Sequence, residues 1–251
     1  MSRTQRQIEE HRKGTVCLVV RDRDGRPCAG VPVWAEQETH AFVFGCAAPE
    51  MGTLNEPDRQ RCGDRLAEVF NRLIPADQPS DPSVIRYDVP ESVPLGRVRV
   101  ELDRLSDVGL PVEVHVRGRV VGLGTDAADR VAAERVAALY TLCFAHPAVG
   151  GIVWHGFWDG EEGTEGGGLL RRDLSPRLAF HFLRKLIGTV WHSRASGATD
   201  AAGRFSFRGF LGDYRVSARI GEEPTTALIS CRDETGEEIQ NACDAAAAGV
   251  D

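Results

Sequence analysis

The chain has 251 residues, of which 42% are apolar and 27% are charged. This composition is typical of a protein that folds around a core, and it excludes a disordered or collagen-like polymer. The net charge of -7 argues against general nucleic-acid binding, because phosphate contacts require a basic surface. No apolar run approaches the roughly 18 residues of a membrane span. The polar amino terminus lacks the apolar stretch of a secretory signal, so we expect a cytoplasmic protein.

Seven cysteines are spaced irregularly, at positions 17, 28, 46, 62, 143, 231 and 243. An odd number without a paired motif fits free thiols in a reducing compartment better than a disulfide framework. Because free cysteine is among the most buried residue types, we expect most of these thiols in the core. No Cys-x-x-Cys pair indicates zinc, and we predict neither a cofactor nor a metal site.

Two segments far apart in the chain have the alternating pattern of β-strands. Residues 15–45 contain TVCLVV, a turn at DRDGRP and the alternating GVPVWAEQ, and residues 199–220 contain GRFSFRGF and GDYRVSARI. Each segment predicts a hairpin. Because an isolated hairpin is marginal in water, we expect the two to pack together. The prediction is a split β-sandwich made of residues 13–45 and 198–222.

The intervening residues 46–197 alternate between helical and strand patterns. Apolar residues at spacings of three and four predict helices over 58–73, 98–105 and 126–145, and from Ser175-Pro176 to about residue 187. LPVEVHV and GGIVWHGFW predict strands, and VIRYDV could form a short strand in the proline-rich stretch 75–95. This order favours parallel strands joined by helical crossovers. We expect the tail over 223–251 to be partly disordered.

Several motifs together resemble a known family. HPAVGGIVWHGFWDG (146–160), with RLSDVGLPVEVHV (104–116) before it and the run 174–218 after it, is similar to the carboxyl-terminal part of glycoside hydrolase family 10, the endo-1,4-β-xylanases. The plant-type branch is the most similar. FNRLIP (70–75) resembles the end of the family's first barrel helix. The segment that opens the family's barrel has counterparts in Gln37, His40, Phe42, Phe44, Gly45 and Ala47.

The resemblance covers about residues 12–75 and 86–220 and implies a (β/α)₈ barrel, which typically needs about 250 residues. Only about 150 are available between the two sandwich segments, and the middle of the barrel is missing between Pro75 and about Tyr87. The predicted fold is therefore α/β, with an incomplete TIM-barrel-like (β/α) domain inserted into a split transthyretin-like β-sandwich. Exposed strand edges would favour homo-oligomers.

The family's mechanism puts activity in question. Retaining glycosidases need two carboxyl groups about 5 to 5.5 Å apart, an acid/base and a nucleophile. The family's acid/base glutamate falls in the missing segment, and its nucleophile aligns with Val116. Glu113 projects from the opposite face of the strand, so it cannot substitute. Two hypotheses follow: a xylanase-like enzyme, and a non-catalytic remnant that binds glycans or proteins.

Two weak candidates for a replacement carboxylate remain. Glu56 lies in an Asn-Glu-Pro triplet that resembles an acid/base signature of related barrel enzymes, but this triplet also suits the first turn of a helix. Glu161, together with Glu162 and Glu165, lies in a Gly-rich loop after a strand, where barrels carry active-site residues. Ordinary loop solvation is the alternative for these three.

The best candidate for substrate binding is the end of the GGIVWHGFW strand. Trp154, His155, Trp158 and Asp159 match the family's W-G-x-W region, whose tryptophans serve as sugar platforms. His155 replaces one of those tryptophans, and core packing is the alternative for Trp154 and Trp158. His115 also ends a strand and could approach His155. The resemblance implies a β-1,4-linked glycan such as xylan as the ligand, and family members are often secreted.

Overall fold

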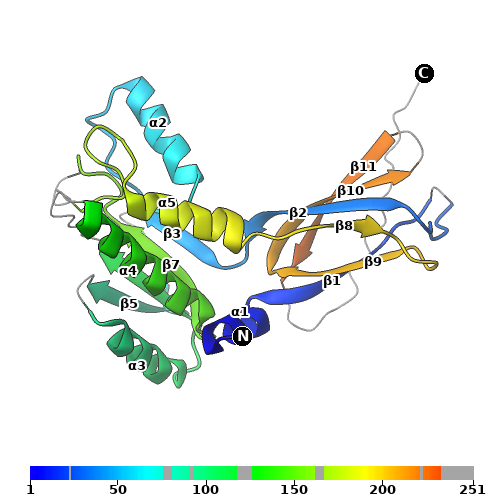
Figure 1. Cartoon of the computed structure of the whole chain (residues 1–251), viewed down its shortest axis with the longest axis horizontal. Coiled ribbons are helices and arrows are strands. Elements are labelled where there is room, and N and C mark those ends of the chain that lie inside the picture. The colour runs from blue at the N-terminus through cyan, green and yellow to red at the C-terminus, as the bar shows by residue number, and fades with distance from the viewer. Residues whose placement is uncertain are drawn as a thin grey trace. The chain divides into compact units, whose positions relative to one another are not determined.

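The computed structural model describes residues 1–22, 24–75, 81–90, 93–117, 126–161, 167–220 and 223–232. The chain divides into two compact units, and Figure 1 shows the elements of each. The first unit consists of Met1–His11 and Phe42–Trp191, and the second of Arg12–Ala41 and the chain from His192 onward. In these described ranges, no helix combines the length and apolar character that crossing a membrane requires.

The first unit is built on a sheet of five parallel strands. In spatial order these are β4 (Arg72–Ile74), β3 (Val43–Ala47), β7 (Val149–His155), β6 (Val112–Arg117) and β5 (Ile85–Pro90). The strands expected in LPVEVHV, GGIVWHGFW and VIRYDV are confirmed, and so is their parallel arrangement.

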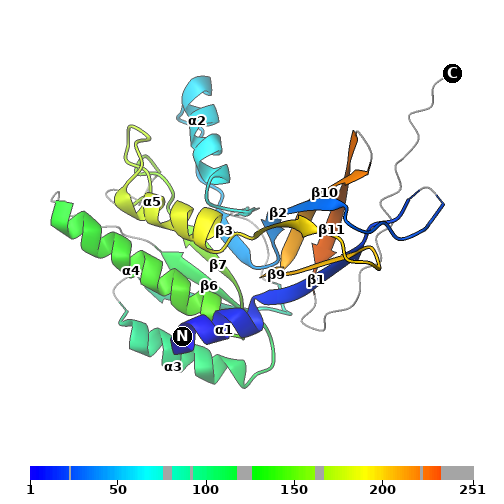
Figure 2. The same cartoon turned by 45° about the vertical axis from the view of Figure 1, so that its right-hand side comes forward.

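Five helices accompany this sheet in the described part of the unit. They are α1 (Arg3–His11), α2 (Glu56–Ala67), α3 (Leu95–Ser106), α4 (Asp126–Ala145) and α5 (Leu178–Lys185), which continues into a π-helical turn, Leu186–Val190. Figures 1 and 2 show α3, α4 and α5 side by side in one layer over the sheet. The helix predicted over 58–73 ends earlier than expected, because its last residues form β4 and pair with β3.

An aromatic cluster joins the sheet to this helical layer. The rings of Phe144 and Trp191 stack with their centroids 4.2 Å apart, and Phe44 of β3 stacks on Trp191 at 5.8 Å. Phe44 therefore marks the face of the sheet that packs on the helices. Because side chains alternate along a strand, the register places Val114, Val116 and Trp154 on this face and Glu113, His115 and His155 on the other.

The second unit contains two antiparallel sheets in its described part. In one, β1 (Lys13–Val19) pairs with β9 (Arg204–Phe210). The other has the order β11 (Glu223–Cys231), β10 (Gly212–Ile220), β2 (Pro32–His40) and β8 (Arg194–Ala198). Side chains of both sheets share one core, which includes Leu18, Val33, Phe205, Tyr214 and Val216.

The two predicted hairpins are wrong, although both segments do form strands. β1 pairs with β9 and not with β2, and β2 lies between β8 and β10. Alternation identifies a strand and its buried face, but it carries no information about which strand is the neighbour. The two sequence segments are therefore interleaved, so that neither can form its sheet without the other.

The boundaries also differ from those expected. Val43–Ala47 belongs to the parallel sheet of the first unit, and Arg194–Ala198 belongs to the second unit. The tail over 223–251 was expected to be partly disordered; its first residues, Glu223–Cys231, form a strand that buries Ile229 and Cys231 in the core. Residues 233–251 lie outside the described part of the chain.

Candidate functional site

Two histidines meet at the carboxyl ends of neighbouring strands. Nδ1 of His115 on β6 lies 2.8 Å from Nε2 of His155 on β7. Nε2 of His115 lies 2.7 Å from Oε1 of Glu113 on the same strand, two residues earlier and on the same face. His115 is only 3% exposed. The expected approach of the two histidines is confirmed, and Glu113 extends the pair into a chain of three hydrogen-bonded groups.

The direction of the bond between Glu113 and His115 follows from its chemistry. This hydrogen bond lowers the pKa of Glu113, so the carboxylate is ionised at pH 7 and can only accept, and Nε2 of His115 therefore carries the proton. Which ring donates the bond between Nδ1 of His115 and Nε2 of His155 depends on the tautomers of the two imidazoles. Burial lowers the pKa of His155 to about 4, and the positive charges of Arg117 and Arg86 add to this effect. His155 is therefore neutral at pH 7.

Exposed charged residues extend this site across the sheet. Arg86 and Asp88 of β5 stand opposite Glu113 and His115 in the register, and Arg117 follows on β6. Nη2 of Arg86 lies 3.1 Å from Oδ1 of Asp88, and Nε of Arg117 lies 3.7 Å from the same oxygen. We use the name polar sheet face for the following set: Arg86, Asp88, Glu113, His115, Arg117 and His155.

Arg86, Asp88 and Arg117 were missed as candidates at the sequence level. Their signal is visible in IRYDVP and VEVHVR, where charged residues occupy alternate positions of both strands. That signal becomes interpretable only when the two strands are known to be parallel neighbours in this register. Within the described residues, no group of three or more His, Cys, Asp and Glu side chains could hold a metal ion.

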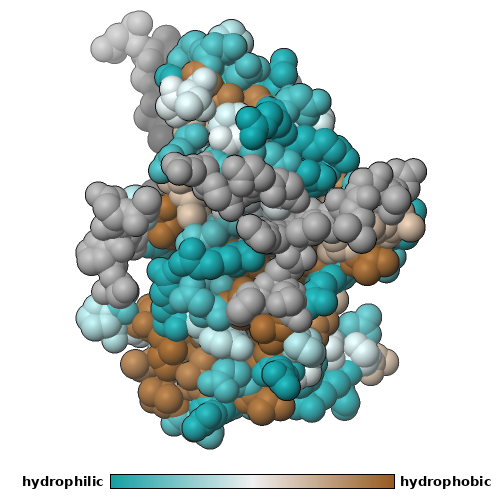
Figure 3. All heavy atoms as spheres, turned by 90° about the vertical axis from the view of Figure 1, so that its left-hand side faces the viewer, coloured by the Kyte–Doolittle hydropathy of each residue, from teal (hydrophilic) through white to brown (hydrophobic). Residues whose placement is uncertain are grey.

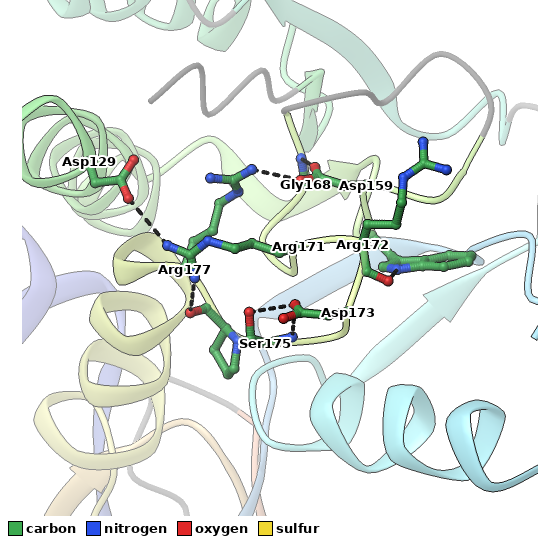
Figure 4. A network of polar contacts seen from close by, with 10 residues as sticks. Asp129, Asp159, Gly168, Arg171, Arg172, Asp173, Ser175 and Arg177 are labelled. Carbon is green, nitrogen blue, oxygen red and sulfur yellow. Dashed lines mark hydrogen bonds and ion pairs between the residues drawn. The ribbon is translucent and has the colours of Figure 1, made fainter. Parts of the chain in front are cut away.

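Asp159 follows β7 and holds the loop that leads to α5 (Figure 4). It is 7% exposed, and its two oxygens have different partners. Oδ2 accepts a hydrogen bond of 2.6 Å from Nη2 of Arg177, and Oδ1 accepts one of 2.7 Å from the backbone N–H of Gly168. Nearby, Arg171 donates to the carbonyl of Pro176 and to Asp129 of α4. These contacts give Asp159 a structural role, because it binds both Gly168 and Arg177.

Trp154 and Trp158, predicted as sugar platforms, are packed in the protein. Trp154 has no exposed surface and Trp158 is 5% exposed. Each indole donates to a backbone carbonyl, Trp154 to Gly156 at 2.9 Å and Trp158 to Arg172 at 3.1 Å. Neither ring offers a face on which a sugar could stack. The alternative of core packing therefore holds, because Trp154 alternates onto the face covered by helices.

The candidate carboxylates also have local partners. Oε1 of Glu161 accepts hydrogen bonds from the backbone N–H groups of Phe157 at 3.1 Å and Trp158 at 3.0 Å. Burial nevertheless raises the pKa of Glu161, and the nearby charge of Glu50 raises it further. Glu162 and Glu165 lie outside the described residues. Glu161 is thus a strand-end carboxyl whose pKa is raised by its burial, although two backbone hydrogen bonds oppose this effect.

Glu56 has the surroundings of a helix start. Its side chain is 79% exposed and forms an ion pair of 3.0 Å with Arg59, three residues later. Oδ1 of Asn55 accepts a bond of 2.9 Å from the backbone N–H of Asp58, which is the geometry of a helix N-cap. The Asn-Glu-Pro triplet therefore begins α2.

Val116 stands at the position that the resemblance assigns to the nucleophile. It is 1% exposed and pairs in register with Trp154, on the face toward the helices. Glu113 lies on the opposite face, as expected from strand alternation. The carboxylate of Glu113 is therefore directed away from the place where the family's nucleophile would align.

No model of a known protein family matches the chain. Three curated proteins are similar to parts of it. Anti-sigma-I factor RsgI6 of Acetivibrio thermocellus is 31% identical over 135 residues, which are 52% of this chain and 16% of that protein. Endo-1,4-beta-xylanase 2 of Arabidopsis thaliana is 31% identical over 134 residues, 51% of this chain and 12% of the relative. Endo-1,4-beta-xylanase 1 of the same plant is 30% identical over 119 residues, which are 46% of this chain and 12% of that protein.

The chain thus matches between an eighth and a sixth of the length of these relatives, and it is distantly similar to plant endo-1,4-β-xylanases over about half of its own length. Among solved structures, xylanase 10B from Thermotoga petrophila RKU-1 in complex with xylobiose aligns with a TM-score of 0.35 and 19% identity, over 43% of this chain and 36% of that chain. The pilus backbone protein RrgB of Streptococcus pneumoniae aligns with a TM-score of 0.21 and 9% identity, over 87% of this chain and 34% of that chain.

Proposed function

We propose that this chain is a non-hydrolytic relative of the family 10 xylanases that binds β-1,4-linked glycans such as xylan through the polar sheet face. The first unit is then a shortened (β/α) barrel in which this face corresponds to the barrel interior. Five parallel strands with helices on one face and charged side chains on the other support this interpretation. The sequence similarity to plant xylanases supports the choice of ligand.

The observation that carries the proposal is the orientation of β6. Val116 is buried against the helical layer at the nucleophile position, while Glu113 is on the opposite face and bound to His115. A retaining hydrolysis needs a carboxylate that can attack the sugar and a second one about 5.5 Å away. Glu113 instead orders the two histidines. Arginine, carboxylate and imidazole groups in this arrangement can exchange hydrogen bonds with sugar hydroxyls without breaking a glycosidic bond.

The test is to incubate the protein with xylohexaose and to analyse the mixture by mass spectrometry, with binding measured separately by calorimetry. We expect unchanged xylohexaose together with measurable binding, and we expect Arg117→Ala to weaken that binding. Shorter xylo-oligomers that depend on the intact protein would overturn the non-hydrolytic proposal. Binding that Arg117→Ala leaves unchanged would remove the polar sheet face as its site.

One observation favours hydrolysis as a second candidate function. The raised pKa of Glu161 is a property that a general acid requires. If products form, Glu161→Gln should abolish them, whereas Glu56→Gln should not, because Glu56 is an exposed residue in the first turn of α2. Comparing the two variants distinguishes the loss of a catalytic carboxyl at Glu161 from a loss of activity that any Glu→Gln substitution would cause.

Association of chains through sheet edges is part of the proposal. β4 and β5 are the two edges of the described parallel sheet, and unpaired edges can recruit strands from another copy. Figure 3 shows hydrophobic residues gathered in the lower part of one face of the molecule, and the exposed apolar side chains of the first unit include Val100 and Val131. Light scattering coupled to gel filtration should detect a homo-oligomer, and a monomer at all concentrations would contradict this part.

A further inference from the structure

An exposed tryptophan stands on the outer face of the four-stranded sheet in the second unit. Along β2, Val33 and Ala35 point into the core and Trp34 points outward, with 48% of its surface exposed. β2 is an interior strand, and its register places Ser217 of β10 and Ser196 of β8 on either side of Trp34. Because both neighbours are small, they leave about half of Trp34 exposed to solvent.

A single exposed aromatic residue is ordinary in soluble proteins, but Trp34 borders a hollow. This hollow has a volume of about 380 Å³ and lies over the same three strands. Volumes of this order, roughly 300 Å³ or more, are typical of small-ligand sites. Its polar lining consists of Glu36, Arg194, Ser196, Arg215 and Ser217. The hollow thus combines one apolar ring face with hydroxyl, carboxylate and guanidinium groups.

The charges around the hollow cancel in pairs. Arg194 donates from Nε to Oε1 of Glu36 at 2.8 Å, and this bond lowers the pKa of Glu36, which keeps the carboxylate ionised. Arg215 donates in the same way to Glu38, which also points outward from β2. Each of these four charges is paired with its opposite, so none of the four is free to attract an anionic or a cationic ligand.

A complementary ligand is therefore neutral, with a flat apolar face and a rim of hydroxyls. A pyranose ring has this chemistry, because its axial C–H groups form an apolar face and its equatorial hydroxyls point outward. A nucleic acid does not fit, because each of its phosphates carries a negative charge. An apolar protein segment would cover the ion pairs and serine hydroxyls without offering them hydrogen bonds, which costs free energy.

We infer that the hollow beside Trp34 is a separate carbohydrate-binding site, in which a pyranose unit of a β-1,4-linked glycan stacks on the indole. The location of the site rests on the geometry of the second unit, whereas the β-1,4 linkage of the ligand rests on the proposed function. The ion pairs of Arg194 with Glu36 and of Arg215 with Glu38 hold the polar groups in place around the ring.

The test is affinity electrophoresis of the full chain in native gels that contain soluble xylan or hydroxyethylcellulose. The variants are Trp34→Ala, Trp34→Phe and the control Leu228→Ala. Leu228 is 66% exposed and stands opposite Arg215 in the register, so the control removes an apolar side chain from the same face of the sheet. Circular dichroism and thermal melting verify that each variant is folded.

We expect Trp34→Ala to lose affinity for at least one of the two glycans by about tenfold or more, equivalent to about 1.4 kcal/mol. Trp34→Phe should retain part of the affinity, because it keeps an aromatic face, and Leu228→Ala should bind like the unmodified protein. Equal retardation of Trp34→Ala and the unmodified protein would overturn the inference. So would an equal loss in Leu228→Ala, which would indicate a general apolar contact, or a lack of retardation by either glycan.

The Arg117→Ala variant, run in the same gels, separates this inference from the proposed function. Loss of xylan binding in Arg117→Ala with full binding in Trp34→Ala would leave the proposed function standing and remove the Trp34 site. The opposite result would keep the Trp34 site and remove the polar sheet face.

Discussion

Nδ1 of His115 and Nε2 of His155 face each other at 2.8 Å across two parallel strands, and Glu113 fixes the far nitrogen of His115. The ionised carboxylate can only accept, so it keeps a proton on Nε2 of His115. This arrangement disfavours a second proton on His155, because the new charge would be partly buried beside His115, Arg117 and Arg86.

The first prediction concerns pH. His155 has a pKa of about 4 in the folded protein, whereas an unfolded histidine titrates near about 6.5. As the pH falls below about 6.5, the unfolded chain takes up a proton at this position that the folded protein does not, so the free energy of unfolding decreases until about pH 4. Urea denaturation at pH 7 and pH 5 should show this loss, and His155→Gln should show a smaller one.

An NMR titration of the histidine ring signals provides the direct measurement. A midpoint for His155 near 6.5, or identical pH dependence of unfolding in the His155→Gln variant, would contradict the buried chain of hydrogen bonds. The 15N shifts of the rings should also show Nε2 of His115 protonated at pH 7.

The second prediction concerns the ion pair between Asp159 and Arg177. Both side chains are nearly buried, with 9% and 12% of their surfaces exposed, and Nη2 lies 2.6 Å from Oδ2. Asp159→Asn leaves the arginine charge buried without its partner, so the free energy of unfolding should fall by about 3 kcal/mol. The control Glu56→Gln breaks an exposed pair and should cost less than about 0.5 kcal/mol. Chemical denaturation of both variants checks this, and equal effects would contradict a structural role for Asp159.

The third prediction concerns the close approach of β3 and β7. A Cβ atom added at Gly151 would lie 2.8 Å from Cβ of Val43, which is too close for two carbon atoms. Gly151→Ala should therefore destabilise the protein by about 1 to 3 kcal/mol, as overpacked core positions do. The adjacent Gly150→Ala is the matched control, because its new Cβ would meet nothing closer than 3.6 Å. Thermal melts that shift equally for both variants would exclude the close contact as the cause.

The elements of the parallel sheet could be predicted from the sequence because each is a local pattern. The strand LPVEVHV and the helix over 126–145 have their own periodicity, and their alternation indicates parallel strands. Strand pairing in the second unit could not be predicted in this way. β1 and β2 are adjacent in the sequence, yet β1 pairs with β9 more than 180 residues later. That choice depends on which buried faces complement one another, and the alternation of a single strand does not encode it.

The candidate site, too, has one part that the sequence predicts and another that it does not. The meeting of His115 and His155 was foreseeable, because both residues end strands of one parallel sheet. The burial of Trp154 depended on the face it occupies, which the pairing of Cys46 with Trp154 and of Phe44 with Ile152 decides. The family resemblance favoured the tryptophans of this strand end. The alternating pattern of β2 predicts that Val33 and Ala35 are buried, but it does not indicate a binding surface at the exposed Trp34.

The fourth prediction concerns the start of α2. Asn55 caps the helix by accepting the backbone N–H of Asp58 at 2.9 Å. Asn55→Ala removes this bond and should lower the free energy of unfolding by about 1 kcal/mol, whereas Asn55→Asp keeps an acceptor and should have little effect. If the Asn-Glu-Pro triplet served catalysis instead, the unmodified protein would shorten xylohexaose, and Asn55→Asp would impair this turnover without changing stability. Denaturation of both variants, with xylohexaose incubation alongside, therefore tests the helix-start interpretation against the catalytic one in a single experiment.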